Sequence, residues 1–392
     1  MPGILLKSLR YSEMLGKPKH WTLDGLELGP INLLVGKNAT GKTRTLNVIA
    51  NMARQFVPEQ KFRSQNGSHE FVFDNNGQRY EYIVHVEEAK VTREEVIVDG
   101  DSKLERGSGG YGKIFNQEEG KKLRFRPPED ELAVAARRDS LQHPFLEPLH
   151  EWAEAVRHYT FGATLGKDHV VISVKGGPET DDRDSNQVVG IFRKAVQKFG
   201  QAFKDAVIAD MAEMGYEIEE IGVYAPENIK ILRGGLATEL LVLGVKERGI
   251  GGVVEQGDMS QGMFRALSIL IQVNYSQIAK RANCILIDDI GEGLDFERST
   301  ALIEILRRKA QAAEFQLVMT TNDRFVMNKV PLEEWSILQR NGCEVQVRNY
   351  ANSRKHFDAF KFMGLNNFDF LRYDFINEDP DEVFEEAGAG KK

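Results

Sequence analysis

The first clear pattern along the chain is a change of hydrophobic period near residue 36. Ile31–Val35 is a mostly apolar, β-branched and leucine-rich run that ends directly at a glycine. Residues 45–56 then carry apolar side chains at three- and four-residue spacing. The first pattern predicts a buried strand and the second an amphipathic helix. The sequence therefore predicts a strand, a glycine-rich loop and a helix in direct succession.

A period of two follows this helix. Alternating apolar runs at 71–73, 80–86 and 96–98 predict strands, and the residues 74–77, Asp-Asn-Asn-Gly, predict a turn between the first two. We expect an antiparallel β-meander here. Residues 100–126 are rich in glycine and charge, and they predict a surface loop.

A helical period returns further along the chain. Residues 129–159 have a helical pattern, and from 188 to 211 apolar residues recur every three or four positions after a loop at 176–186. Such a stripe is typical of packing between helices rather than of a ligand site. We therefore expect a helical insertion over residues 139–215.

The last third alternates between strand and helix signals. Strands are predicted at 229–232, 240–243, 284–287 and 316–319, and helices at 261–279 and 298–313. Alternation of this kind predicts a parallel sheet with crossover helices, and hence an α/β fold class.

Composition limits the classes of protein that fit. The chain has 392 residues, of which 41% are hydrophobic and 28% charged, as in a folded globular protein. A net charge of -8 does not indicate direct nucleic-acid binding. Two cysteines without metal-ligand spacing make a zinc site improbable. No apolar stretch of about 18 residues occurs, so we expect a cytoplasmic protein with no membrane partner.

The loop after the first strand carries the clearest chemistry. It reads Gly36-Lys37-Asn38-Ala39-Thr40-Gly41-Lys42-Thr43, which fits G-x-x-x-x-G-K-S/T between a strand and a helix, the context of a P-loop. Glycines let backbone N–H groups face phosphates, the lysine adds positive charge, and the hydroxyl holds Mg²⁺. The predicted cofactors are ATP and Mg²⁺. We expect ATP contacts from Gly36, Asn38, Gly41, Lys42, Thr43 and Arg44.

A second motif supplies carboxylates. The predicted strand at 284–287 ends in Asp288 and Asp289, as a Walker B strand does. We expect Asp288, together with Thr43, to hold Mg²⁺, and Asp289 to orient the attacking water.

Three further segments resemble the heads of ATP-binding cassette (ABC) ATPases. Residues 259–263 look like the signature motif before a helix, residues 291–295 resemble the D-loop, and residues 320–323 stand at the switch position. The resemblance implies that Ser260, Gly262 and Asp295 contribute to a nucleotide site shared with a second copy. It implies a P-loop NTPase fold of ABC-ATPase type with an antiparallel β-meander and a helical insertion.

Within that superfamily the motif order resembles the RecF/SMC/OLD side. The runs around Gly262, Asp288 and Asp295 look most like OLD-related ATPases that serve as subunits of bacterial anti-phage systems such as PARIS. This implies a homodimer or higher homo-oligomer that works with a separate effector, a nuclease or toxin. The alternative is a RecF-like ATPase of DNA maintenance that binds DNA directly.

Three departures from the family pattern predict slow hydrolysis. Asp289 stands where the family has a catalytic glutamate, Asn322 replaces the switch histidine, and Met263 replaces a glutamine or glutamate. ATP binding needs none of the three missing groups. We therefore expect Asp289, Asn322 and Lys42 to form a slow catalytic set.

Two assignments stay open. Gln142 is either a Q-loop glutamine that completes the Mg²⁺ ligands or part of a surface turn beside Pro144. Residues 121–126 mix basic and aromatic side chains, which fits either a nucleic-acid contact or a solvated face. The predicted domains are an N-terminal ATPase lobe (1–138), the helical insertion (139–215), a C-terminal ATPase lobe (216–350) and a tail (351–392).

Overall fold

The computed structural model describes residues 3–57, 66–173, 180–226, 239–280, 283–313 and 315–378. The chain divides into two compact units. Unit 1 comprises residues 1–157, 283–286 and 314–392, and unit 2 comprises residues 158–282 and 287–313. Each unit is described separately.

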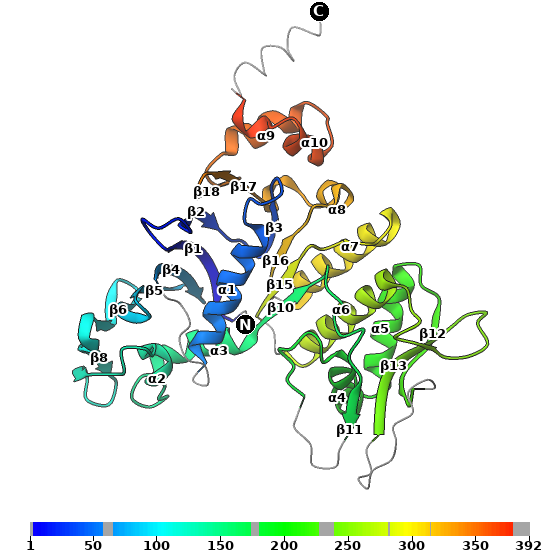
Figure 1. Cartoon of the computed structure of the whole chain (residues 1–392), viewed down its shortest axis with the longest axis horizontal. Coiled ribbons are helices and arrows are strands. Elements are labelled where there is room, and N and C mark those ends of the chain that lie inside the picture. Colours follow the sequence, from blue (N-terminus) through cyan, green and yellow to red (C-terminus); the bar gives the residue numbers. More distant parts are fainter. Residues whose placement is uncertain are drawn as a thin grey trace, which may run out of the picture. The chain divides into compact units, whose positions relative to one another are not determined.

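A large mixed sheet forms the frame of unit 1 (Figure 1). Within the described residues it has fourteen strands in the order β10-β15-β16-β3-β17-β18-β2-β1-β4-β5-β6-β7-β8-β9. The strands are β1 (Leu5–Glu13), β2 (Trp21–Glu27), β3 (Ile31–Val35), β4 (Gly67–Asn75), β5 (Gln78–Glu87), β6 (Lys90–Val98), β7 (Asp101–Arg106), β8 (Gly112–Asn116), β9 (Lys121–Phe125), β10 (Val156–Thr160), β15 (Cys284–Asp288), β16 (Gln316–Thr320), β17 (Trp335–Asn341) and β18 (Glu344–Asn349).

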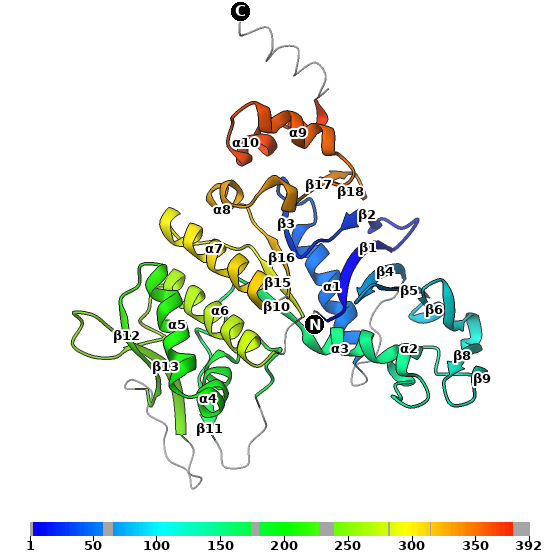
Figure 2. The same ribbon diagram turned by 180° about the vertical axis from the view of Figure 1, so that it is seen from behind.

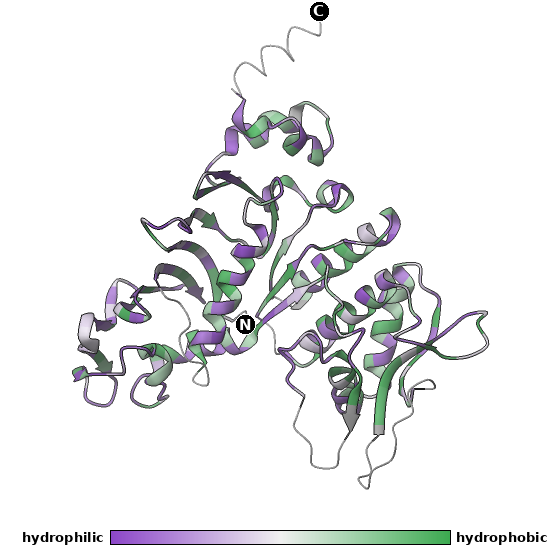
Figure 3. Ribbon diagram, in the orientation of Figure 1, coloured by the Kyte–Doolittle hydropathy of each residue, from purple (hydrophilic) through white to green (hydrophobic). Residues whose placement is uncertain are grey.

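The central strands are parallel and buried. β3 pairs in parallel with β16 on one side and β17 on the other. Every residue of β3, β15 and β16 is buried, and β15 is hydrophobic along most of its length (Figure 3). Continuous apolar strands are what a parallel sheet covered on both faces requires. The strands predicted at 284–287 and 316–319 and the helices predicted at 261–279 and 298–313 are confirmed, whereas the strand predicted at 240–243 belongs to an antiparallel sheet.

Helix α1 (Lys42–Phe56) follows β3 and buries one face. Its last residue, Phe56, lies edge-on to Tyr82 of β5 and to Trp152 of α3 (Glu147–Ala155). These rings join α1 to the antiparallel part of the sheet. The helix therefore begins at the loop after β3 and ends in the main core cluster.

The predicted meander is confirmed as β4, β5 and β6, with a turn at Asp74–Gly77. The predicted loop at 100–126 is wrong, because β7, β8 and β9 occupy most of it. Leu104 and Ile114 are buried while their charged neighbours face outward. β7, β8 and β9 each contain few apolar residues, so the alternation typical of a strand was hard to recognise among the glycines and charged residues.

Two helix predictions also differ from the structure. Residues 129–159 contain the short α2 (Ala133–Ala136), the 3-10 turn η2 (Pro144–Leu146) and α3 before β10 begins, rather than one long helix. The helix predicted from 188 to 211 is two helices, α4 (Val188–Phe199) and α5 (Gln201–Glu213). They are separated at Gly200, where φ is 60° and ψ is -141°, a conformation that favours glycine.

In unit 2, α4 and α5 pack against the long α6 (Gln261–Ile278). A smaller sheet has β13 (Glu239–Glu247) between β11 (Val171–Ser173) and β12 (Ile218–Tyr224), and β14 (Val254–Glu255) also pairs with β13. α7 (Phe296–Ala313) completes the unit. The strand predicted at 240–243 lies in β13, and the one predicted at 229–232 lies outside the described residues.

The last described elements of unit 1 follow the β17–β18 hairpin (Figures 1 and 2). They are α9 (Arg354–Phe362), α10 (Asn367–Arg372) and the 3-10 turn η4 (Phe375–Asn377), and α8 (Arg324–Lys329) precedes the hairpin. The aromatic residues of this region pack together, with Phe370 in contact with Phe357, Phe360 and Phe375. Among the helices of the described residues, none has the length and apolar character needed to span a bilayer.

Candidate nucleotide-binding site

The loop between β3 and α1, residues 36–43, is tightly constrained by its glycines. A Cβ on Gly36 would lie 2.7 Å from the Leu338 carbonyl oxygen and 2.8 Å from Thr40 Oγ1. A Cβ on Gly41 would lie 2.9 Å from the Trp21 ring, and Gly41 also has a left-handed backbone with φ of 104°. Only glycine satisfies both positions, so loop 36–43 is held close to the sheet.

Lys42 is the first residue of α1 and is buried. Its Nζ donates to the Gly36 carbonyl at 2.9 Å and to the Lys37 carbonyl at 3.3 Å. The ammonium group therefore closes the loop from inside. Lys37, Asn38, Ala39 and Thr43 are exposed, so the tip of the loop and the second residue of α1 lie at the surface of unit 1.

Arg44, also predicted to contact ATP, lies toward β1 and β2. Its guanidinium lies 4.4 Å from the Trp21 ring centroid and forms an ion pair with Glu13. Tyr11 Oη donates to the same Glu13 carboxylate at 2.5 Å. Burial, with a smaller contribution from Arg340, lowers the pKa of Arg44. The structure thus places Arg44 in a contact network that its sequence position did not indicate.

A cavity of about 700 Å³ lies beside the tip of loop 36–43. Arg340 Nη1 donates to the Ala39 carbonyl at 3.1 Å, and Lys37 Nζ lies 3.7 Å from Asp374 Oδ2. Arg348 of β18 also lines it. Sequence reasoning missed Arg340, Arg348 and Asp374, because they belong to no motif and only the fold brings them to the loop.

In unit 2, segment 259–263 caps a helix. Ser260 Oγ accepts a hydrogen bond from Met263 N at 3.2 Å, at the N-terminus of the 18-residue α6. A Cβ on Gly262 would lie 2.8 Å from the Gly293 carbonyl oxygen. The predicted signature and D-loop segments therefore meet at a glycine.

Arg265 holds two loops of unit 2 together through three carbonyls. Its guanidinium donates to the carbonyls of Ala163 at 3.0 Å and Glu292 at 3.1 Å, and also to that of Gly162. Sequence reasoning missed this residue. Its place three residues after Gly262, on the same helix face, is the signal that could have found it.

The two predicted Walker B carboxylates differ in setting. Asp288 ends β15 and is 2% exposed, and its carbonyl accepts from Phe161 N at 2.8 Å. Asp289 follows with a left-handed φ of 54°, which is uncommon for a residue other than glycine. Asp295 accepts from Arg298 N at 2.9 Å at the start of α7, and this hydrogen bond lowers the pKa of its carboxyl.

Two further predicted residues belong to unit 1. Asn322 follows β16, whose Thr320 pairs with Leu34 of the neighbouring parallel strand β3, and it is exposed two residues before α8. Gln142 is exposed in a turn at β8, where its carbonyl accepts from Gln117 N at 2.8 Å and its N donates to Asp139. The turn lies beside the end of β8, and the assignment of Gln142 as a magnesium ligand stays a prediction.

Metal ligands are otherwise sparse. Among the residues that the structure describes, no group of three or more His, Cys, Asp or Glu side chains could hold a metal ion.

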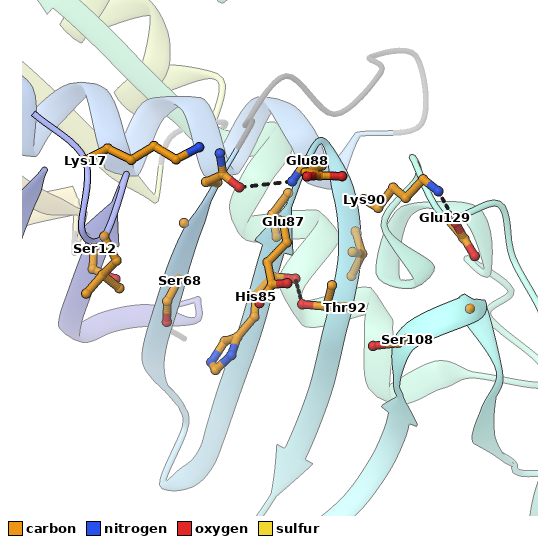
Figure 4. A pocket seen from close by; sticks show the side chains of 16 residues that line it. Ser12, Lys17, Ser68, His85, Glu87, Glu88, Lys90, Thr92, Ser108 and Glu129 are labelled. Atoms are coloured by element: carbon orange, nitrogen blue, oxygen red, sulfur yellow. Dashed lines mark hydrogen bonds and ion pairs between the residues drawn. The ribbon is translucent and has the colours of Figure 1, made fainter. Parts of the chain in front are cut away.

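A second hollow, of about 880 Å³, lies on the meander (Figure 4). Ser12, Ser68 and His85 lie opposite one another on neighbouring strands at its floor. Lys90 at its rim pairs with Glu129 at 3.1 Å. No residue predicted for nucleotide binding lines this hollow.

Comparison with known proteins supports the fold. No protein-family model and no curated protein matches the sequence. The structure is similar to an SMC head bound to the C-winged-helix domain of ScpA, with a TM-score of 0.53 and 12% identity over 88% of this chain and 97% of that one. It is also similar to a Pyrococcus furiosus SMC head with an extended coiled coil, bound to the C-terminal domain of ScpA. That TM-score is 0.50, with 12% identity over 92% and 100% of the two chains.

The chain therefore has the mixed α/β fold with a large sheet that these SMC heads share. The expected fold class is confirmed at this level. The helical insertion and the domain boundaries stay predictions.

The close approach at Gly262 can be tested directly. Gly262→Ala should lower the free energy of unfolding by about 1–3 kcal/mol, because its Cβ would press on the Gly293 carbonyl. Gly257→Ala is the matched control, since a Cβ there meets nothing within 4 Å, and it should change stability by less than about 0.5 kcal/mol. Urea denaturation measures both. Equal effects would show that the two segments do not meet at Gly262.

Proposed function

We propose that the protein is an ATP-binding, slowly hydrolysing ATPase of ABC type. The observation that carries the proposal is loop 36–43 itself. The backbone at Gly36 and Gly41 lies so close to neighbouring strands that only glycine fits at either position. The tip of the loop is exposed, and the loop leads directly into the 15-residue helix α1. Free N–H groups at a helix N-terminus with a lysine at the first position suit the phosphates of a nucleotide.

The magnesium ligands in this proposal are Thr43 and Asp288. Both offer the oxygen atoms that Mg²⁺ prefers, and one carboxylate with phosphate and water oxygens is a usual set. Support for Asp288 comes from its place at the end of the fully buried strand β15, as in a Walker B motif, and support for Thr43 from its place directly after Lys42 of the loop. Bound Mg²⁺ would neutralise charge on the phosphates.

Slow turnover follows from the side chains offered for catalysis. Asp289 would orient the attacking water with a carboxylate one methylene shorter than glutamate. Asn322 would donate a hydrogen bond to the terminal phosphate without adding charge. Lys42 would leave the carbonyls of Gly36 and Lys37 and donate to the phosphates instead.

A second copy of the chain would complete each site. Ser260 and Gly262 lie at the N-terminus of α6, where N–H groups and a hydroxyl form an anion-binding end. Asp295 directly precedes α7 and ends the D-loop segment, whose Gly293 carbonyl lies against Gly262. Arg265 fixes this end to the loops at Gly162 and Glu292. We therefore propose a homodimer or higher homo-oligomer assembled through ATP.

Lys42→Ala tests the binding site. Loss of the ammonium group should weaken ATP binding by about 10- to 100-fold, the worth of a charge-assisted hydrogen bond to phosphate. Isothermal titration calorimetry with Mg-ATP measures the change. Lys355→Ala removes an equal charge from an exposed position of α9 and should bind as the wild type does. Normal ATP affinity in Lys42→Ala would remove loop 36–43 from the proposal.

Asp289→Asn tests the catalytic assignment. Asparagine tolerates the left-handed backbone of this position but cannot accept a proton. We expect ATP affinity to stay within about twofold and the rate of phosphate release to fall by at least about tenfold. Hydrolysis at the wild-type rate would exclude Asp289 from the reaction.

The cellular role proposed is that of a sensor or scaffold subunit of an anti-phage system that controls a separate nuclease or toxin. Its support is the resemblance of the motif runs at 260–262, 287–290 and 292–295 to OLD-related ATPases. The alternative role is a RecF-like ATPase that binds DNA directly, which the SMC-head fold also accommodates.

Co-purification with the products of flanking genes separates these roles. A stable complex that is lost in Lys42→Ala, with little DNA affinity, is the expected result. Tight DNA binding that weakens steeply with salt, without a protein partner, would favour the alternative.

A further inference from the structure

We propose that the acidic segment 378–386 binds the cationic cavity beside loop 36–43 of its own chain and competes with ATP for it. The proposal rests on the proposed function, because it assigns a regulator to the same loop. The regulator is a run of carboxylates, the side-chain class that most resembles phosphate in charge.

The cavity has an excess of positive charge. Its lining includes three cations, Lys37, Arg340 and Arg348, against one carboxylate, Asp374. Arg340 and Arg348 form no ion pair with another described residue. Uncompensated cations around a hollow of about 700 Å³ attract a polyanion.

A carboxylate from the same part of the chain already reaches the loop. Asp374 Oδ2 lies 3.7 Å from Lys37 Nζ, while its Oδ1 accepts from Asn377 Nδ2 at 3.1 Å. Asn377 Oδ1 in turn accepts from Gln339 Nε2 of β17 at 3.1 Å. A chain of side-chain contacts thus runs from β17 through Asn377 and Asp374 to Lys37.

The acidic segment begins directly after Asn377, the middle member of these contacts. Residues 378–386 read Glu-Asp-Pro-Asp-Glu-Val-Phe-Glu-Glu, with six carboxylates and no cation. Asn377, the residue before it, lines the cavity. Nine residues can span up to about 30 Å, so the segment is long enough to reach every cation of the cavity. Attachment at the rim also gives it a high effective concentration there.

The contact with Lys37 connects this segment to nucleotide binding. Lys37 belongs to the loop tip, and Arg340 holds the neighbouring Ala39 carbonyl. A triphosphate that draws on these groups must displace the carboxylates, and carboxylates that hold them reduce the affinity for ATP. The competition is between charges at an exposed site, so salt should weaken it.

The first experiment neutralises the segment in the full chain. A variant with Asp379→Asn, Asp381→Asn, Glu382→Gln, Glu385→Gln and Glu386→Gln keeps the length and should bind ATP about three- to tenfold more tightly at low salt. The difference should shrink at about 0.5 M salt, where the Debye length falls to a few ångströms. Equal affinity of wild type and variant at low salt would overturn the proposal. If neither protein binds ATP, the proposed function is contradicted, and the second experiment then decides whether the segment binds the cavity.

The second experiment does not need ATP. A fluorescein-labelled peptide of residues 376–388 is titrated into the neutralised variant carrying Lys42→Ala, and binding is read by anisotropy. We expect saturable binding that weakens at least about fivefold with Arg348→Ala and not with Lys355→Ala, the charge-matched control outside the cavity. Binding that is unchanged by Arg348→Ala, or no binding, would overturn the proposal.

The ATP measurements of the first experiment also separate one chain from two. If the effect of neutralisation on ATP affinity disappears on dilution of the protein, the segment acts on a second copy, which contradicts the assignment within one chain.

Discussion

Loop 36–43 depends on two positions where its backbone lies closer to the neighbouring strands than a Cβ atom would allow. Gly36 lies against the Leu338 carbonyl of β17, and Gly41 lies against the Trp21 ring of β2. Two strands of the sheet therefore fix both ends of the loop, and Lys42 closes it through the carbonyls of Gly36 and Lys37. The fully buried parallel strands provide the rigid support on which this geometry depends.

Unit 2 also contains a glycine at which two segments approach too closely for a Cβ atom. Gly262 lets segment 259–263 meet segment 291–295, and Arg265 then satisfies the carbonyls of Gly162, Ala163 and Glu292. Because loop carbonyls near a surface are otherwise left to water, one guanidinium that serves three of them fixes the loops relative to α6. In each unit, a glycine contact sets the position and a cationic side chain holds it.

The sequence predicted those features that depend on local pattern and failed where distant residues decide. Loop 36–43 was recognisable because strand, glycines and helix are contiguous, and the meander because its strands alternate. Strands β7–β9 were missed since Leu104 and Ile114 are isolated among charges, and the break at Gly200 was missed since the apolar stripe continues through it. Arg340, Arg348 and Asp374 come together only in the folded chain. Gln142 was placed by its order in the sequence alone, and its role as a magnesium ligand stays a prediction.

The central claim is that ATP bound at loop 36–43 joins two copies of the chain through the N-terminus of α6. Sedimentation velocity of the Asp289→Asn variant, with and without Mg-ATP, measures this most directly, because slow hydrolysis preserves the bound state. The account predicts a monomer without nucleotide, a dimer with Mg-ATP, and no dimer when Ser260→Arg is added. A sedimentation coefficient that does not change with Mg-ATP, although ATP is bound, would contradict it.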